Sequence, residues 1–114
     1  MDKQTKINTV IRTYCDQRYK LDKNVIKINV HNTIEHEIGK LIKSFELQKE
    51  GYEVYSEVIF KNGRRADLFT PINCSVYEIL CSETKEEALS KTENYPDGLE
   101  IFLLESSDLI KVLK

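Results

Sequence analysis

Two acidic residues, Asp67 and Glu78, are separated by eleven positions, and each lies in a segment with a strand pattern. Asp67 ends a short β-rich segment, whereas Glu78 lies midway along a segment that is almost wholly apolar. Antiparallel pairing of the two segments would bring both carboxylates to one point of a sheet. A carboxylate on a buried strand is costly without a metal ion, a cationic partner or a proton. The pair therefore predicts either a metal site or an ion pair with Arg64, Arg65 or a lysine.

A third acid can come from the helical segment that precedes these strands. Glu35 and Glu37 both lie in its first turn, and we favour Glu35 as the residue that reaches the pair. Glu57 precedes Asp67 on the first strand of the hairpin and is expected at the surface, although it can face the same pocket. His31 and His36 do not form the HExxH arrangement of zinc proteases, so we expect surface or capping histidines and no zinc.

The elements that must position these residues follow from the apolar periodicity. Asn62-Gly63 lies between two strand patterns and predicts a hairpin, and Gly51 predicts the end of the preceding helix. The final helix is expected to be capped by Ser106 or Ser107. The predicted helices cover residues 4–20, 33–49, 84–95 and a short final segment, and the predicted strands cover 25–30, 53–60, 64–70, 74–82 and 99–105.

From residue 33 the predicted order is α-β-β-β-α-β-α. A three-strand meander followed by a helical crossover predicts an α/β (α+β) fold, with a mixed four-stranded central sheet and helices on both faces. Residues 74–82 should form its central strand. The first 30 residues lie outside this core, which covers 31–114, and should either extend the sheet or pack on a partner chain, as in a homodimer.

Length and composition limit the classes of protein to which the chain can belong. The chain has 114 residues, which is typical of one domain, and a net charge of −2, which does not by itself indicate a nucleic-acid binder. A run of about 18 apolar residues is absent, so we expect neither a membrane span nor a secretion signal. The three cysteines, Cys15, Cys74 and Cys81, show no CxxC pair and are expected to be free thiols.

The segment from Asn32 to Ser106 resembles the restriction-endonuclease-like PD-(D/E)XK superfamily in element order and in the spacing of its acids. Arg65-Ala66-Asp67 stands where that family has Pro-Asp, and Glu78-Ile79-Leu80 stands where it has Glu-x-Lys. The helical segment Ile34-Glu35-His36-Glu37-Ile38 is similar to the family's helical glutamate motif.

The resemblance implies phosphodiester hydrolysis of DNA. Asp67 and Glu78 would hold Mg²⁺ or Mn²⁺, with Glu35 binding the ion directly or through water. Leu80 replaces the family lysine, and Lys91 or, less favoured, Lys85 would substitute for it. The residues that would grip phosphates are Arg64, Arg65 and Lys61.

The missing lysine leaves alternatives open. The site is expected to be slow, or the chain is a degenerate nuclease fold that serves as a nucleic-acid-binding or protein-interaction module. A structural dimer whose acids form salt bridges is a third alternative. The lysine- and isoleucine-rich composition resembles that of small archaeal-virus proteins, which implies the cytoplasm of a host cell.

Overall fold

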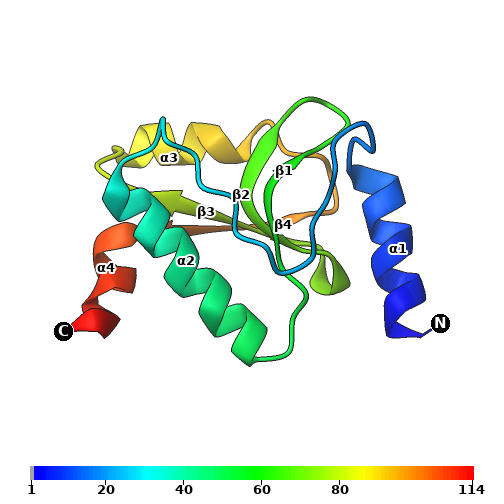
Figure 1. Cartoon of the computed structure of the whole chain (residues 1–114). Helices are drawn as coiled ribbons and strands as arrows, with labels where there is room; N and C mark the ends of the chain where they lie inside the picture. Colours follow the sequence, from blue (N-terminus) through cyan, green and yellow to red (C-terminus); the bar gives the residue numbers. More distant parts are fainter. Residues whose placement is uncertain (1) are drawn as a thin grey trace.

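The structure, a computed structural model, describes residues 2–114 except for the side chain of Lys85. It is a mixed α/β fold with a four-stranded sheet in the order β1-β2-β3-β4 (Figure 1). β1, β2 and β3 pair antiparallel, and β4 pairs parallel to β3. The elements are α1 (Lys3–Tyr14), α2 (Ile34–Lys49), β1 (Tyr55–Ile59), β2 (Arg65–Thr70), β3 (Ser75–Leu80), α3 (Lys85–Thr92), β4 (Glu100–Glu105) and α4 (Ser106–Ile110), with short 3₁₀ turns at Pro71–Asn73 and Lys111–Leu113.

The predicted order of elements from α2 to α4 is confirmed. The Asn62-Gly63 turn closes the hairpin, because the Phe60 N–H donates to the Arg64 carbonyl at 2.9 Å and Gly63 adopts a φ of +87°. All six residues of β3 are buried between β2 and β4, so its prediction as the central strand is also confirmed.

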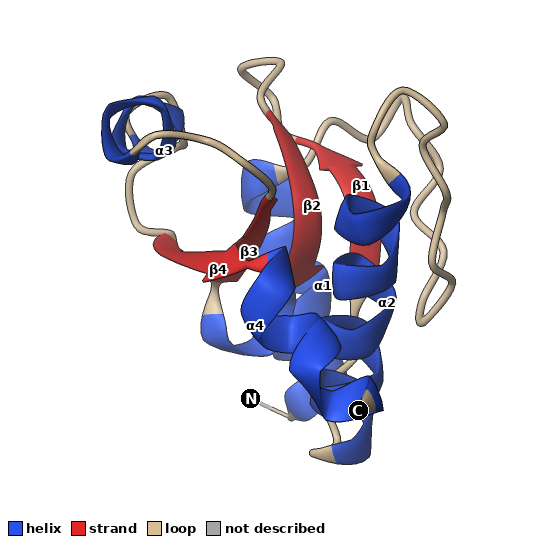
Figure 2. Ribbon diagram, turned by 90° about the vertical axis from the view of Figure 1, so that its left-hand side faces the viewer, coloured by secondary structure: helices blue, strands red, loops and turns tan. Residues whose placement is uncertain are grey.

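The helices cover both faces of the sheet (Figure 2). α1 packs on one face, where Val10 and Cys15 contact a core that includes Phe60 and Phe69. α2 and α4 pack together on the opposite face, over a smaller core of Leu47, Val54, Leu68 and Tyr77. The polar residues of the sheet must therefore fit between two apolar layers.

α2 begins and ends where the sequence predicts. The Thr33 hydroxyl accepts from the His36 N–H at 3.1 Å, and Gly51 follows the helix at a φ of +97°. The face that it buries is unexpected, because the residues buried on it include His36, Lys40 and Ser44. Large apolar side chains of α2 face solvent instead, namely Ile34, Leu41 and Phe45.

β1 changes face in its middle. Glu57 has a φ of +51°, which is uncommon for a residue with a side chain. Before it, Tyr55 packs in the α1-side core and the Ser56 hydroxyl bonds residues 25–27 on the α2 side. After it, Val58 lies in the α1-side core, although strict alternation would place it with Ser56. The left-handed residue therefore leaves both Ser56 and Glu57 on the α2 side, because Glu57 contacts groups there.

Four predictions of secondary structure need correction. Residues 25–30 form no strand, because their backbone bonds to side chains rather than to a neighbouring strand. α1 ends at Tyr14 rather than at residue 20, because Cys15 turns extended and forms a bridge with Phe60. Asp67 lies within β2 rather than at its end. The N-cap position of α4 is Glu105, without a side-chain hydrogen bond, so neither serine caps this helix.

Two expectations drawn from composition can also be compared with the structure. The three cysteines are free thiols, as predicted. Within residues 2–114, no helix is long and apolar enough to cross a membrane.

Candidate functional site

Asp67 and Glu78 meet where β2 and β3 separate. Leu68 and Tyr77 form the last pair of this ladder, and one further step along both strands places Asp67 opposite Glu78. The backbone there no longer pairs, because the Ile79 N–H donates to Oδ2 of Asp67 at 2.8 Å. The structure therefore brings these two acids together through antiparallel pairing of their strands, as the sequence predicts.

Glu78 is buried, with its side chain 7% exposed. Oε1 accepts from the Tyr95 hydroxyl and lies 3.8 Å from a terminal nitrogen of Arg64, whose guanidinium packs 4.7 Å from the centre of the Tyr95 ring. Burial, together with the hydrogen bond to Asp67 and the charge of that carboxylate, raises the pKa of Glu78 to about 9. The raised pKa favours the protonated form of Glu78 beside the Asp67 carboxylate.

His36 of α2 contacts the same pair. Its Nε2 lies 3.2 Å from Oδ2 of Asp67, and its Nδ1 lies 2.7 Å from Oε2 of Glu37. Burial opposes protonation of the ring, but the hydrogen bonds and charges of these two carboxylates outweigh it and raise the pKa of His36 to about 9. Burial likewise opposes ionisation of Asp67, yet the bonds from His36, Glu78 and the Ile79 N–H hold its pKa below the usual value.

Lys40 extends this network on the α2 side of the sheet. Its side chain is fully buried, and its Nζ donates to Oε1 of Glu37 at 2.8 Å and to the Lys27 carbonyl at 2.7 Å. Oε2 of Glu57 lies 3.7 Å away. The network therefore joins three carboxylates, an imidazolium and an ammonium group across α2, β1, β2 and β3.

Sequence reasoning missed His36 and Lys40. Glu37 and Lys40 are three apart and His36 and Lys40 are four apart, so both pairs share a helix face. That spacing is the one signal that could have found them. It is weak, because the apolar residues of the same segment predict a different buried face.

The structure does not bring Glu35 to the carboxylate pair. One residue turns a helix by about 100°, so the face that buries His36 and Lys40 turns Glu35 outward, where it is exposed. Glu37, which was the less favoured helix acid, is the one that contacts the network. His36 is buried, so the expectation that it lies at the surface is wrong. His31 is exposed, as expected.

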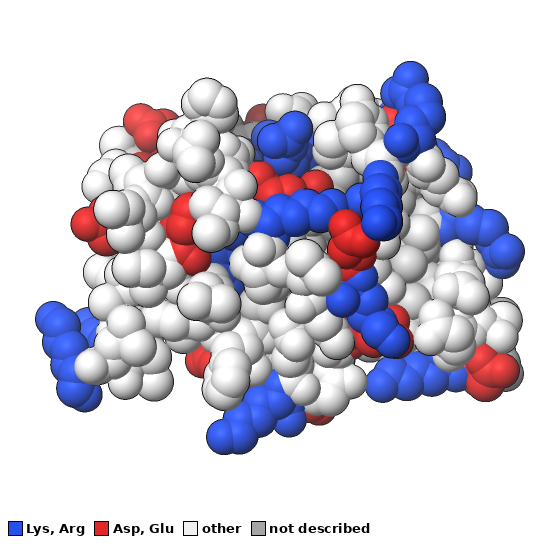
Figure 3. Space-filling view, viewed as in Figure 1, with Lys and Arg blue, Asp and Glu red and all other residues white. Residues whose placement is uncertain are grey.

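The predicted basic residues have different positions. Lys91 Nζ bonds Oε1 of Glu83 at 2.8 Å, and its charge offsets a small part of the rise in the pKa of Glu78. Arg65 is half exposed and lies 3.9 Å from Glu57, while Lys61 is exposed. The side chain of Lys85 lies outside the described part. Figure 3 shows acidic and basic side chains intermixed on the face that it presents.

Leu80, the residue that follows Ile79 on β3, is buried and is 4% exposed. It lines a hollow of about 450 Å³ together with Ala88 and Leu103. Among residues 2–114, no group of three or more His, Cys, Asp or Glu side chains is arranged to hold a metal ion. Comparisons with protein-family models, curated proteins and solved structures found no match.

Proposed function

We propose that the chain is a metal-dependent, nuclease-like protein that hydrolyses DNA phosphodiesters slowly at Asp67 and Glu78. The observation that carries this proposal is the position of two carboxyl groups directly opposite each other on neighbouring strands, Glu78 buried and Asp67 13% exposed, with the pKa of Glu78 raised by burial and by Asp67. Like charges so close do not both ionise without a cation between them. A divalent ion would take the place of the proton that the raised pKa favours on Glu78.

The order of the core elements supports the same proposal. A helix, a three-strand antiparallel meander and a helical crossover to a parallel fourth strand are what the restriction-endonuclease-like resemblance implies. The acids lie on the second and third strands of this core, as the family motif requires.

Asp67 and Glu78 offer the type of ligand that Mg²⁺ or Mn²⁺ prefers, but one oxygen of Asp67 is already bonded within the protein. Mg²⁺ usually keeps several waters and takes one or two carboxylates, which Asp67 and Glu78 can supply. The contact of His36 with Asp67 limits the site, since it occupies one carboxylate oxygen. When bound, the ion would lower the pKa of a coordinated water and offset charge on the scissile phosphate.

The side chains of the protein would perform the remaining steps. Arg64 lies beside Glu78 and can bind a phosphate, and Arg65 has a side chain that reaches solvent. Lys91 is the basic group that would replace the missing lysine, although Glu83 now holds it. Loss of a proton-handling group typically costs about 10²–10⁴-fold in rate, so slow turnover is the expected result.

Thermal unfolding with EDTA, Mg²⁺ and Mn²⁺ tests the proposal. Metal should stabilise the wild-type chain by about 2.7 kcal/mol at a hundredfold excess over Kd. Asp67→Asn should abolish this stabilisation, whereas Glu35→Gln, a control at an exposed acid of α2, should keep it. An absence of any metal response in the wild-type chain would contradict the proposal.

Cleavage of single-stranded, duplex and branched DNA is the second measurement. We expect slow cleavage that requires the metal and is lost in Glu78→Gln. Metal binding without cleavage would instead favour a degenerate nuclease fold that binds nucleic acid or protein. The observations that favour this second candidate are the buried Leu80 and the pairing of Asp67 with His36.

Leu80→Lys tests whether the missing lysine alone limits DNA cleavage at this site. The hollow beside Leu80 has room for the longer side chain, and Glu83 also lines it. If the missing lysine limits turnover, this variant should cleave DNA faster than the wild-type chain. Leu80→Met is the matched control, because it keeps the size without the charge.

A further inference from the structure

Residues 25–29 run along α2 and β1 with one edge of their backbone turned inward. Three alternate residues make these inward bonds, which is the spacing of an extended chain. The bonds join Val25, Lys27 and Asn29 to the side chains of Ser56, Lys40 and Glu37 at 2.6 to 2.9 Å. The segment is therefore fixed on one side by side chains in place of a neighbouring strand.

The other edge of the segment is open. Within residues 2–114, the N–H and C=O groups of Ile26 and Ile28 and the N–H of Val30 have no protein partner. The side chains of Ile28 and Val30 are 76% and 85% exposed. An exposed apolar edge with free backbone groups is a template for pairing with another strand.

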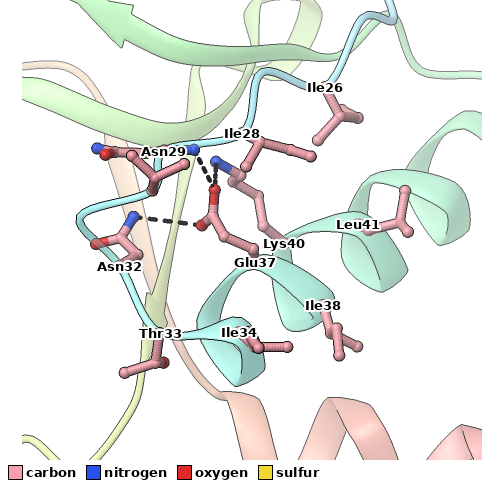
Figure 4. Close-up of a pocket in the computed structure, with 11 residues that line it drawn as sticks. Ile26, Ile28, Asn29, Asn32, Thr33, Ile34, Glu37, Ile38, Lys40 and Leu41 are labelled. Atoms are coloured by element: carbon pink, nitrogen blue, oxygen red, sulfur yellow. Dashed lines mark hydrogen bonds and ion pairs between the residues drawn. The ribbon is translucent and has the colours of Figure 1, made fainter.

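An apolar groove lies beside this edge (Figure 4). It has a volume of about 510 Å³ and separates Ile26 and Ile28 from the exposed stripe of α2, which includes Ile34 and Leu41. The charged residues of its lining, Glu37 and Lys40, are bonded to each other at 2.8 Å. The groove therefore fits an occupant with apolar side chains and a free strand edge of its own.

We propose that this occupant is the same segment of a second copy, paired antiparallel about a twofold axis at Ile28. In this register Ile28 faces its own copy and Ile26 faces Val30, so apolar side chains meet on one face. Lys27 then faces Asn29, and no like charges are opposed. An axis at Lys27 would place two ammonium groups opposite each other, which is unfavourable.

The same surface explains why a second copy suits the edge better than a charged or polar partner. The edge presents backbone donors and acceptors together with aliphatic side chains. The same edge of a second copy presents matching groups and can pair with it. The inference does not rest on the proposed nuclease activity. Its test requires neither metal nor DNA.

Ile28→Cys in the full chain tests the register. Facing residues of a hydrogen-bonded antiparallel pair have Cα atoms about 5.5 Å apart, which is within disulfide range. Mild oxidation should convert this variant to a covalent dimer that reductant reverses. Val112→Cys, at another exposed apolar position, and the wild-type chain with its free thiols should stay largely uncrosslinked. Equal crosslinking of both cysteine variants would overturn the register.

Sedimentation equilibrium tests the association itself. The wild-type chain should show a concentration-dependent dimer, and Ile28→Asp should shift its dissociation constant at least tenfold towards monomer. Because Ile28 is exposed, circular dichroism should report an unchanged fold. Val112→Asp is the matched control and should dimerise as the wild type does. A wild-type chain that stays monomeric at every concentration would overturn the proposal.

Discussion

His36 and Asp67 form an ion pair between α2 and β2, with Nε2 of the imidazole 3.2 Å from Oδ2 of the carboxylate. The contact joins the helix to the point where β2 and β3 separate. It also leaves both groups charged at neutral pH, because the pKa of His36 is raised and that of Asp67 is lowered.

His36→Gln should destabilise the protein in a pH-dependent way. The pKa of His36 rises from 6.5 to about 9 on folding, so its stabilisation is complete below about pH 6.5 and is lost as the pH rises through 9. The cost of the variant should be about 3 kcal/mol at pH 6 and much smaller above pH 9. Urea unfolding across this range measures it, with His31→Gln, a substitution at an exposed histidine, as the control.

Glu78→Gln should stabilise the protein at alkaline pH. Folding raises the pKa of Glu78 from 4.5 to about 9, so this group costs stability increasingly as the pH rises between these values. A glutamine keeps the neutral form and can still accept from Tyr95. The stability of the variant relative to the wild type should therefore rise steadily as the pH rises through this window. A lower stability than the wild type at pH 8 would show that Glu78 is ionised.

Lys40→Met should be strongly destabilising. Removing the ammonium leaves Glu37 and Glu57 buried near each other without their cation, and breaking a buried ion pair typically costs about 3–5 kcal/mol. Adding Glu57→Gln should restore part of the loss. Lys43→Met, on the same helix but in a partly exposed pair with Glu46, should change the free energy of unfolding by less than about 1 kcal/mol.

Gly39→Ala tests the close packing of α2. A methyl group there would lie 3.1 Å from Cγ2 of Ile79 and 3.4 Å from Cβ of Ser106. Overpacking of this kind typically costs about 1–3 kcal/mol, which should exceed the gain of about 1 kcal/mol in helix propensity. Denaturant unfolding measures the balance, and Lys43→Ala on the same helix is the control. A more stable Gly39→Ala variant would mean that α2 can move away from β3.

The sheet topology could be predicted from the sequence because local signals agree there. Asn62-Gly63 determines the hairpin, the apolar run of β3 determines the central strand, and the crossover through α3 determines the parallel β4. The meeting of Asp67 and Glu78 follows from the same pairing, since both lie one step beyond the last pair of the ladder.

The remaining features depend on contacts that the sequence signals only weakly. Ile34 and Leu41 have the periodicity of a buried stripe, yet the carboxylates of the sheet pair with His36 and Lys40, so the opposite face of α2 is buried. Residues 25–30 alternate as a strand does, but the groups that bond them are side chains. The pattern therefore correctly indicated an extended chain and wrongly indicated a strand.

The left-handed backbone at Glu57 limits which substitutions β1 can tolerate at this position. This backbone favours glycine or asparagine, whereas the carboxylate of Glu57 is the second one near the buried Lys40, after that of Glu37. A substitution that relaxes the backbone therefore removes one of the two carboxylates near Lys40, and one that keeps the charge retains an unfavourable torsion. Two changes made together, at 57 and at 40, are the route by which related chains could diverge here, so these positions should covary among descendants of this protein.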